Sequence, residues 1–242
     1  MIRGTSIVMC ALATLFAATN SFAVDGSSPA KSAFVCKAKL SSSDLQGTLN
    51  RVQQSYQKLN SVSARFDQDS YLAALDTSET SSGTVLFSKP GRMRWDYEDP
   101  EPQQFVLRDH TVWLYQPEIK QVVIDELSQV LLTDLPVSFL MGVGNLNDGF
   151  SLKGGCKSEA GTVLTLEPRK ADKKSDNSLK TFKLLVSPEN FPAGAQVLDV
   201  VGNTTTIALS AVKENEPIED SKFTATYPPG TDINDRRVEK RG

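Results

Sequence analysis

Hydrophobic residues recur along this chain with two different periods. Between Ser43 and Asn60 they return every three or four positions, which is typical of a helix with one apolar face. The side chains of that stripe are Leu45, Leu49, Val52, Tyr56 and Leu59. Because the stripe is narrow, we expect the helix to lie on another apolar surface.

After Asn60 the period changes to two, which indicates a strand with one buried face. Val62, Ala64 and Phe66 alternate with polar residues. More short runs follow, and the turns between them contain proline and glycine or the pair Asp109-His110. These predicted strands are residues 83–88, 92–98, 103–109, 111–116 and 120–125. The spacing predicts an antiparallel meander.

Residues 126–149 interrupt this alternation with a segment that is apolar over about half of its length. Thr133-Asp134 predicts a helix start with Pro136 in the first turn, and Gly142 would follow its end. Beyond this segment the strand pattern resumes at residues 150–153, 162–167, 179–186, 195–201, 204–211 and 222–226.

The number of predicted strands limits the architecture. A flat open sheet of about eleven strands would leave long unpaired edges, so the sheet must curl or close. We therefore predict a mainly β (α+β) fold, in which one curved antiparallel sheet or partial barrel is covered by two helical segments.

The first residues predict export. Arg3 precedes an apolar run from Ile7 to Ala18 and a polar stretch that ends at Ala23, the features of a secretory signal peptide over residues 1–23. We expect residues 24–42 to form a flexible lead, residues 43–236 one domain, and residues 237–242 a basic tail.

Charge and cysteine content narrow the possible partners. Loss of the signal peptide removes one basic residue, Arg3, and moves the formal net charge from -3 to -4. Such a weakly acidic chain argues against nucleic acid as a partner. Cys36 and Cys156 remain after export, and a disulfide between them is expected in an oxidising compartment. Two unpaired thiols are the alternative.

Few residues suit an enzyme. The single histidine, His110, excludes a two-histidine metal site and lies in a tight turn that tolerates histidine well. The chain lacks a nucleophile elbow and a phosphate-binding loop. Asp67 and Asp69 could form an acid–base pair, but a solvated outer strand face is the favoured interpretation. We predict no catalytic site, no cofactor and no metal site.

Residues 83–124 carry a family resemblance. Their sequence is GTVLFSKPGRMRWDYEDPEPQQFVLRDHTVWLYQPEIKQVVI. The arginine-x-tryptophan strand, the proline turn and the tryptophan-x-tyrosine strand resemble the periplasmic outer-membrane lipoprotein carrier family LolA. Phe66-x-Gln68 upstream and SKFTATYPPGTDINDR downstream, residues 221–236, are similar to the same family.

The resemblance implies an unclosed antiparallel β-barrel with a helical lid, whose cavity holds the acyl chains of lipoproteins. It further implies a periplasmic monomer that accepts lipoproteins from an ATP-driven inner-membrane release complex and passes them to an outer-membrane receptor. In the family a basic residue before the proline helps to hold the lid, and Lys89 matches that position. Lysine cannot form the planar paired bonds of arginine, so Arg92 and Arg94 are further candidates for the tether.

Physical chemistry agrees with the carrier that the resemblance implies. Three acyl chains contain about 45 methylenes, whose exposure to water at about 0.8 kcal/mol each costs on the order of 35 kcal/mol. An apolar hollow avoids this cost. The residues expected to line it are Phe87, Met93, Trp95, Tyr97, Phe105, Trp113 and Tyr115, and those expected to form the lid are Leu135, Val137, Phe139 and Leu140.

Other interpretations remain open from the sequence. The alternating side chains could fill an ordinary closed core. With the same architecture, the protein could also be a lipid-sensing or regulatory module, or a carrier of a glycolipid or sterol-like molecule.

Overall fold

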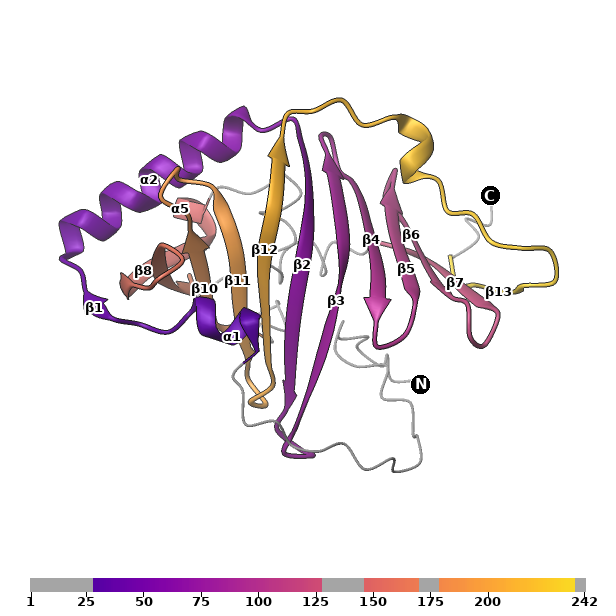
Figure 1. Cartoon of the computed structure of the whole chain (residues 1–242), viewed down its shortest axis with the longest axis horizontal. Helices are drawn as coiled ribbons and strands as arrows, with labels where there is room; N and C mark the ends of the chain where they lie inside the picture. Colours follow the sequence, from indigo (N-terminus) through magenta and orange to yellow (C-terminus); the bar gives the residue numbers. More distant parts are fainter. Residues whose placement is uncertain (1–27, 128–145, 170–178, 238–242) are drawn as a thin grey trace.

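A single mixed sheet dominates the computed structural model, which describes residues 28–127, 146–169 and 179–237. The sheet has thirteen strands in the order β1-β8-β9-β10-β11-β12-β2-β3-β4-β5-β6-β7-β13 (Figure 1). All neighbours pair antiparallel except β13 and β7, which are parallel. The two edge strands, β1 and β13, do not pair with each other, so the sheet is unclosed.

The strands occupy most of the described chain. Their bounds are β1 Ala38–Lys39, β2 Ser61–Leu72, β3 Thr77–Ser88, β4 Arg92–Asp99, β5 Gln103–Arg108, β6 Thr111–Gln116, β7 Gln121–Glu126, β8 Phe150–Lys157, β9 Thr162–Pro168, β10 Leu179–Val186, β11 Pro192–Asp199, β12 Thr204–Glu214 and β13 Asp232–Asp235. The described helices are α1 Pro29–Ala33, α2 Ser42–Lys58, α5 Leu146–Gly149 and a 3₁₀ helix, Asp220–Phe223. The predicted mainly β, unclosed architecture is confirmed.

Helix α2 covers one face of the sheet, called here the inner face (Figure 1). Ser41 caps its start by accepting a hydrogen bond from the backbone N–H of Asp44 at 3.2 Å. The apolar stripe predicted from the sequence is buried against β8, β9 and the centre of the sheet. The inner face consists of the side chains that cross-strand pairing places beside Val62, Phe87 and Trp95.

The opposite, outer face is covered by segments from both ends of the chain. Helix α1 lies on β2 and β12, where Lys31 Nζ is 2.7 Å from Asp69 Oδ1. Phe34 packs with Cys156, Val163 and Leu185 in a small separate apolar cluster.

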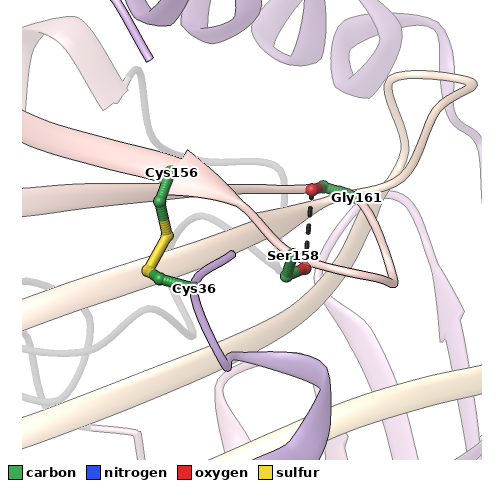
Figure 2. The surroundings of a disulfide bond; sticks show 4 residues. All are labelled: Cys36, Cys156, Ser158 and Gly161. Atoms are coloured by element: carbon green, nitrogen blue, oxygen red, sulfur yellow. Dashed lines mark hydrogen bonds between the residues drawn. A yellow bond between two sulfur atoms is a disulfide. The ribbon is translucent and has the colours of Figure 1, made fainter. Parts of the chain in front are cut away.

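The predicted flexible lead over residues 24–42 is therefore wrong for residues 29–39. Small polar residues gave no periodicity there, yet the segment is attached at both ends by side-chain bonds. Besides the Lys31–Asp69 ion pair, Cys36 and Cys156 form a disulfide with a Cα–Cα distance of 5.6 Å (Figure 2). The alternative of two unpaired thiols is excluded.

The C-terminal segment does not form the last strand that the sequence predicts. Residues 222–226 were expected to form a strand, but they contain the end of the 3₁₀ helix and an irregular stretch. Phe223 is fully buried on the outer face, and the following chain reaches the sheet edge as β13. The apolar residues that suggested a strand instead anchor a covering segment.

The disulfide predicts a measurable stabilisation. It closes a loop with a sequence separation of 120, for which the chain-entropy relation gives about 4–5 kcal/mol of unfolding free energy. We expect a reducing agent to lower the urea midpoint of the protein. The variant Cys36→Ala/Cys156→Ala should start at that lower midpoint and not respond to the reducing agent. Equal midpoints for the oxidised and reduced protein would contradict this assignment.

Candidate lipid-binding site

An apolar cavity lies between α2 and the inner face of the sheet. Its volume is about 60 Å³, room for about five water-sized groups at about 10–15 Å³ each. None of the lining residues that the structure describes carries a formal charge. They are Tyr56, Leu59, Val62, Val85, Phe87, Met93, Trp95, Phe182, Leu184, Phe191, Pro192, Gly194, Ala195, Ile207 and Leu209.

Three of the seven predicted cavity residues line this space. Phe87, Met93 and Trp95 are buried, and their side chains come from β3 and β4. Phe105 pairs with Trp95 and shares the inner face, but it lies at the margin of the apolar core and not in the cavity wall.

Tyr97 also occupies the inner face, beyond the cavity. Its ring packs edge-on against Phe66 at 5.0 Å between centroids, and its hydroxyl donates to Gln68 Oε1 at 3.3 Å. Burial raises the pKa of Tyr97 to about 12. Gly83 makes this packing possible, because a Cβ there would lie 2.0 Å from the Asp96 carbonyl oxygen and 3.0 Å from the Phe66 ring.

Trp113 and Tyr115 lie on the outer face, contrary to the prediction. Trp113 pairs with Val106, and Tyr115 pairs with Gln104, whereas the inner face continues through Leu114 opposite Phe105. The ring of Tyr115 is 6.0 Å from that of Tyr227 in the C-terminal segment. Strand β6 carries apolar residues at both alternating positions, so its sequence pattern did not indicate which of them face inward.

The opposite wall of the cavity was not predicted from the sequence. Phe182 and Leu184 come from β10, while Ile207 and Leu209 come from β12. Each pair shows period-two spacing, which marks an inward face. What the pattern lacked was the strand order, which places β12 beside β2 and brings the two halves of the sheet together.

Lys89 fastens the C-terminal end of α2. Its Nζ donates to the carbonyl oxygens of Tyr56 at 2.9 Å and Gln57 at 3.2 Å, and it lies 5.1 Å from the Tyr56 ring centre. A cation at a helix C-terminus is stabilised by the unpaired carbonyl groups there. Partial desolvation lowers the pKa of Lys89. Lys89 therefore joins the turn between β3 and β4 to the helix that covers the cavity.

Gln53 attaches the middle of α2 on its buried side. Its Oε1 accepts a hydrogen bond from the backbone N–H of Leu146, at the start of α5, at 3.0 Å. Both residues are buried. Arg51 Nε of the same helix donates to Asn190 Oδ1, in the turn between β10 and β11, at 3.0 Å. Apart from its apolar stripe, α2 is thus held by polar bonds to three separate parts of the chain.

Arg92 and Arg94, the other predicted tethers, contact the C-terminal segment on the outer face. Arg92 pairs with Asp220, and its guanidinium carbon is 5.4 Å from the Phe223 ring centre. Arg94 donates to the Lys222 carbonyl oxygen at 3.0 Å. Arg92 also donates to Ser88 Oγ and to the Lys89 carbonyl oxygen. Arg94 also donates to Asp96 Oδ2. None of these bonds of Arg92 and Arg94 reaches α2, and a bond from Lys89, Arg92 or Arg94 to the predicted lid stays a prediction.

The predicted lid residues Leu135, Val137, Phe139 and Leu140 lie outside the described residues. Their role stays a prediction.

The predicted acid pair is separated from the cavity. Asp67 and Asp69 project from the outer face of β2, opposite Val62 and Phe66. Asp67 is half-buried, and Asp69 is only 3% exposed because α1 covers it, so the predicted solvated position is wrong for Asp69. In the described part of the chain, no group of three residues could hold a metal ion.

Comparison with known proteins identifies the family of this architecture. The family profile described as outer membrane lipoprotein carrier protein LolA matches residues 57–226. This chain belongs to the LolA family. The LolA family is a family of carriers and not of enzymes.

Two relatives named outer-membrane lipoprotein carrier protein illustrate the LolA match. The protein of Azotobacter vinelandii is 30% identical over 77% of this chain and 87% of its own length. The protein of Pseudomonas aeruginosa is 28% identical over 81% of this chain and 91% of its own length. A solved structure of an uncharacterised conserved protein from Thermus thermophilus is similar with a TM-score of 0.49 and 15% identity, covering 80% of this chain and 99% of that one.

The placement of the two tryptophans predicts different responses to bound lipid. Trp95 lines the cavity, whereas Trp113 lies on the outer face. We expect a fatty acid with brominated carbons to quench the fluorescence of Trp113→Phe, in which Trp95 is the only tryptophan. The matched variant Trp95→Phe should show less than about a fifth of that quenching. Equal quenching of both variants would contradict the placement of the site.

Proposed function

We propose that this chain is a periplasmic carrier that shelters lipoprotein acyl chains between α2 and the inner face of the sheet. The supporting observation is the cavity at this position, whose described lining residues carry no charge. Hydrocarbon needs only such a surface, because its transfer from water depends on buried apolar area and not on directional bonds.

The small volume of the cavity requires α2 to move. About five water-sized groups fit, whereas the acyl chains of a lipoprotein have about 45 methylenes. A close-packed protein interior does not stretch gradually to admit a ligand. We therefore expect α2 to move away from the sheet as one rigid unit. The bonds from Lys89 to the last turn of α2 oppose that separation.

The same bonds favour release. When the protein closes, it regains the Lys89 bonds and the contacts of the α2 stripe. This gain offsets part of the free-energy cost of expelling the cargo. A carrier without this competing closed state would bind acyl chains more tightly and deliver them less readily. We propose this competition as the basis of transfer.

The proposed partners follow from the cargo. An ATP-driven inner-membrane complex would supply the lipoprotein, and an outer-membrane receptor would accept it, since nothing in the chain suggests nucleotide binding. A periplasmic location is supported by the signal-peptide pattern and by the Cys36–Cys156 disulfide. We propose a monomer without enzymatic activity, cofactor or nucleic-acid partner.

Incubation with inner-membrane vesicles that contain the release complex, ATP and a lipoprotein tests this function. The purified chain should move the lipoprotein into the soluble fraction, and mass spectrometry should detect the triacylated peptide bound to it. Recovery of only a glycolipid or sterol-like molecule, or of a stable protein partner without lipid, would contradict the proposal and favour the alternative carrier or the regulatory module.

Replacing Lys89 should favour the open state. Lys89→Met removes the two bonds to α2 but keeps an apolar stem of similar length. We expect an apparent affinity for a fluorescent fatty acid about 3- to 30-fold higher, which corresponds to about 0.7–2 kcal/mol. Transfer of the bound probe to acceptor vesicles should slow by a similar factor.

Lys58→Met provides the matched control. Lys58 is the last residue of α2 and is exposed. Its replacement removes a positive charge from the same end of the helix but leaves the bonds to the turn between β3 and β4 intact. Its affinity should equal that of the unmodified protein. If Lys89→Met and Lys58→Met behaved alike, Lys89 would not control closure.

A further inference from the structure

Two hairpin turns present exposed aliphatic side chains at one end of the sheet. One turn joins β2 to β3 over residues 72–77, and the other joins β11 to β12 over residues 199–204. Both lie at the end of the sheet opposite the junction of α2 and β2 (Figure 1). Leu75, Val200 and Val201 are 65%, 62% and 71% exposed, and they are half of the six large hydrophobic residues exposed in the described chain.

The two turns are joined to each other. The backbone N–H of Ala73 donates to Asn203 Oδ1 at 3.0 Å, and a Cβ built on Gly202 would lie 3.2 Å from Ala73 Cβ. The three aliphatic side chains therefore belong to one surface, called here the tip pair: residues 72–77 and 199–204.

The tip pair extends beyond its neighbouring strand. Pairing of β3 with β4 ends at Ser82 opposite Asp99, so among the described strands residues 77–81 have no partner on that side. Residues 74–80 are all exposed. A convex projection of this kind can enter a soft apolar medium, whereas a protein partner would need a matching hollow.

Several polar groups of the tip pair are bonded within it or to the adjoining end of β2. Asp199 Oδ1 accepts hydrogen bonds from the backbone N–H groups of Val201 at 2.9 Å and Asn203 at 2.8 Å, and the Asp199 carbonyl oxygen accepts from the Gly202 N–H at 3.4 Å. Asp76 Oδ1 accepts from the Tyr71 hydroxyl at 2.9 Å. Internal bonding of this kind lowers the cost of bringing a turn into contact with hydrocarbon.

The charge of the tip pair limits the type of surface. Its residues include Asp76 and Asp199 but neither lysine nor arginine. Anionic headgroups would repel it, and attraction cannot depend on charge. Zwitterionic lipid is the surface that fits.

We propose that the tip pair docks the protein weakly on a zwitterionic lipid surface by inserting Leu75, Val200 and Val201. This contact lies outside the acyl-chain cavity and adds a membrane-facing end to the proposed carrier. A single myristoyl chain gives only marginal binding, so three short side chains produce a transient contact that permits departure.

An environment-sensitive dye tests the contact. The substitution Val201→Cys, labelled with nitrobenzoxadiazole, should show a blue shift and increased fluorescence with phosphatidylcholine vesicles at millimolar lipid. The shift should persist in 0.5 M salt and decrease when a third of the lipid is phosphatidylglycerol. Adding Leu75→Ser and Val200→Ser should lower the bound fraction at least threefold.

Ile119 supplies the matched control. It is 58% exposed in the turn between β6 and β7, at a distance along the chain from both hairpins. Dye at Ile119→Cys should not respond to vesicles. A silent dye at position 201, an equal response at position 119, or a signal that requires anionic lipid would overturn the proposal, whatever the outcome of the acyl-chain assays.

Discussion

The structure depends on how the apolar inner face of an unclosed sheet is kept from water. Strands β2, β3, β4, β10 and β12 present hydrocarbon toward α2, and the helix returns an apolar stripe toward them. Removing that stripe without a replacement would expose several large side chains at about 1.5–3 kcal/mol each. Acyl chains can be the replacement, because hydrophobic burial is not directional. In the proposed carrier, the same surface therefore stabilises the closed protein and receives the cargo.

The two faces of the sheet have different kinds of cover. On the outer face, α1 is held by the Cys36–Cys156 disulfide and the Lys31–Asp69 ion pair, and the C-terminal segment is held by Arg92, Arg94 and buried Phe223. On the inner face, α2 is attached by the hydrogen bonds of Lys89, Gln53 and Arg51. A covalent bond and buried anchors suit a permanent cover, whereas a few hydrogen bonds suit one that opens.

Much of this arrangement could be predicted from local sequence patterns. The three-to-four spacing from Leu45 to Tyr56 gave α2, and the alternation around Trp95 gave its inward direction, because each pattern reports a single buried face. Strand β6 could not be resolved in this way, since the C-terminal segment buries its other face near Tyr115. The residues missed in β10 and β12 needed the strand order, which depends on long-range pairing. Helix α1 was not predicted, because it is held in place by tertiary bonds at Lys31 and Cys36 and not by a local sequence pattern.

Photochemical cross-linking of a bound lipoprotein tests the central claim most directly. Its acyl chains would carry a diazirine near the terminal methyl group, and the modified residues would be identified by peptide mass spectrometry. The account predicts adducts on the cavity wall, at Val85, Trp95, Leu184 or Leu209. Adducts confined to the outer face, around Val106 and Phe223, would contradict it.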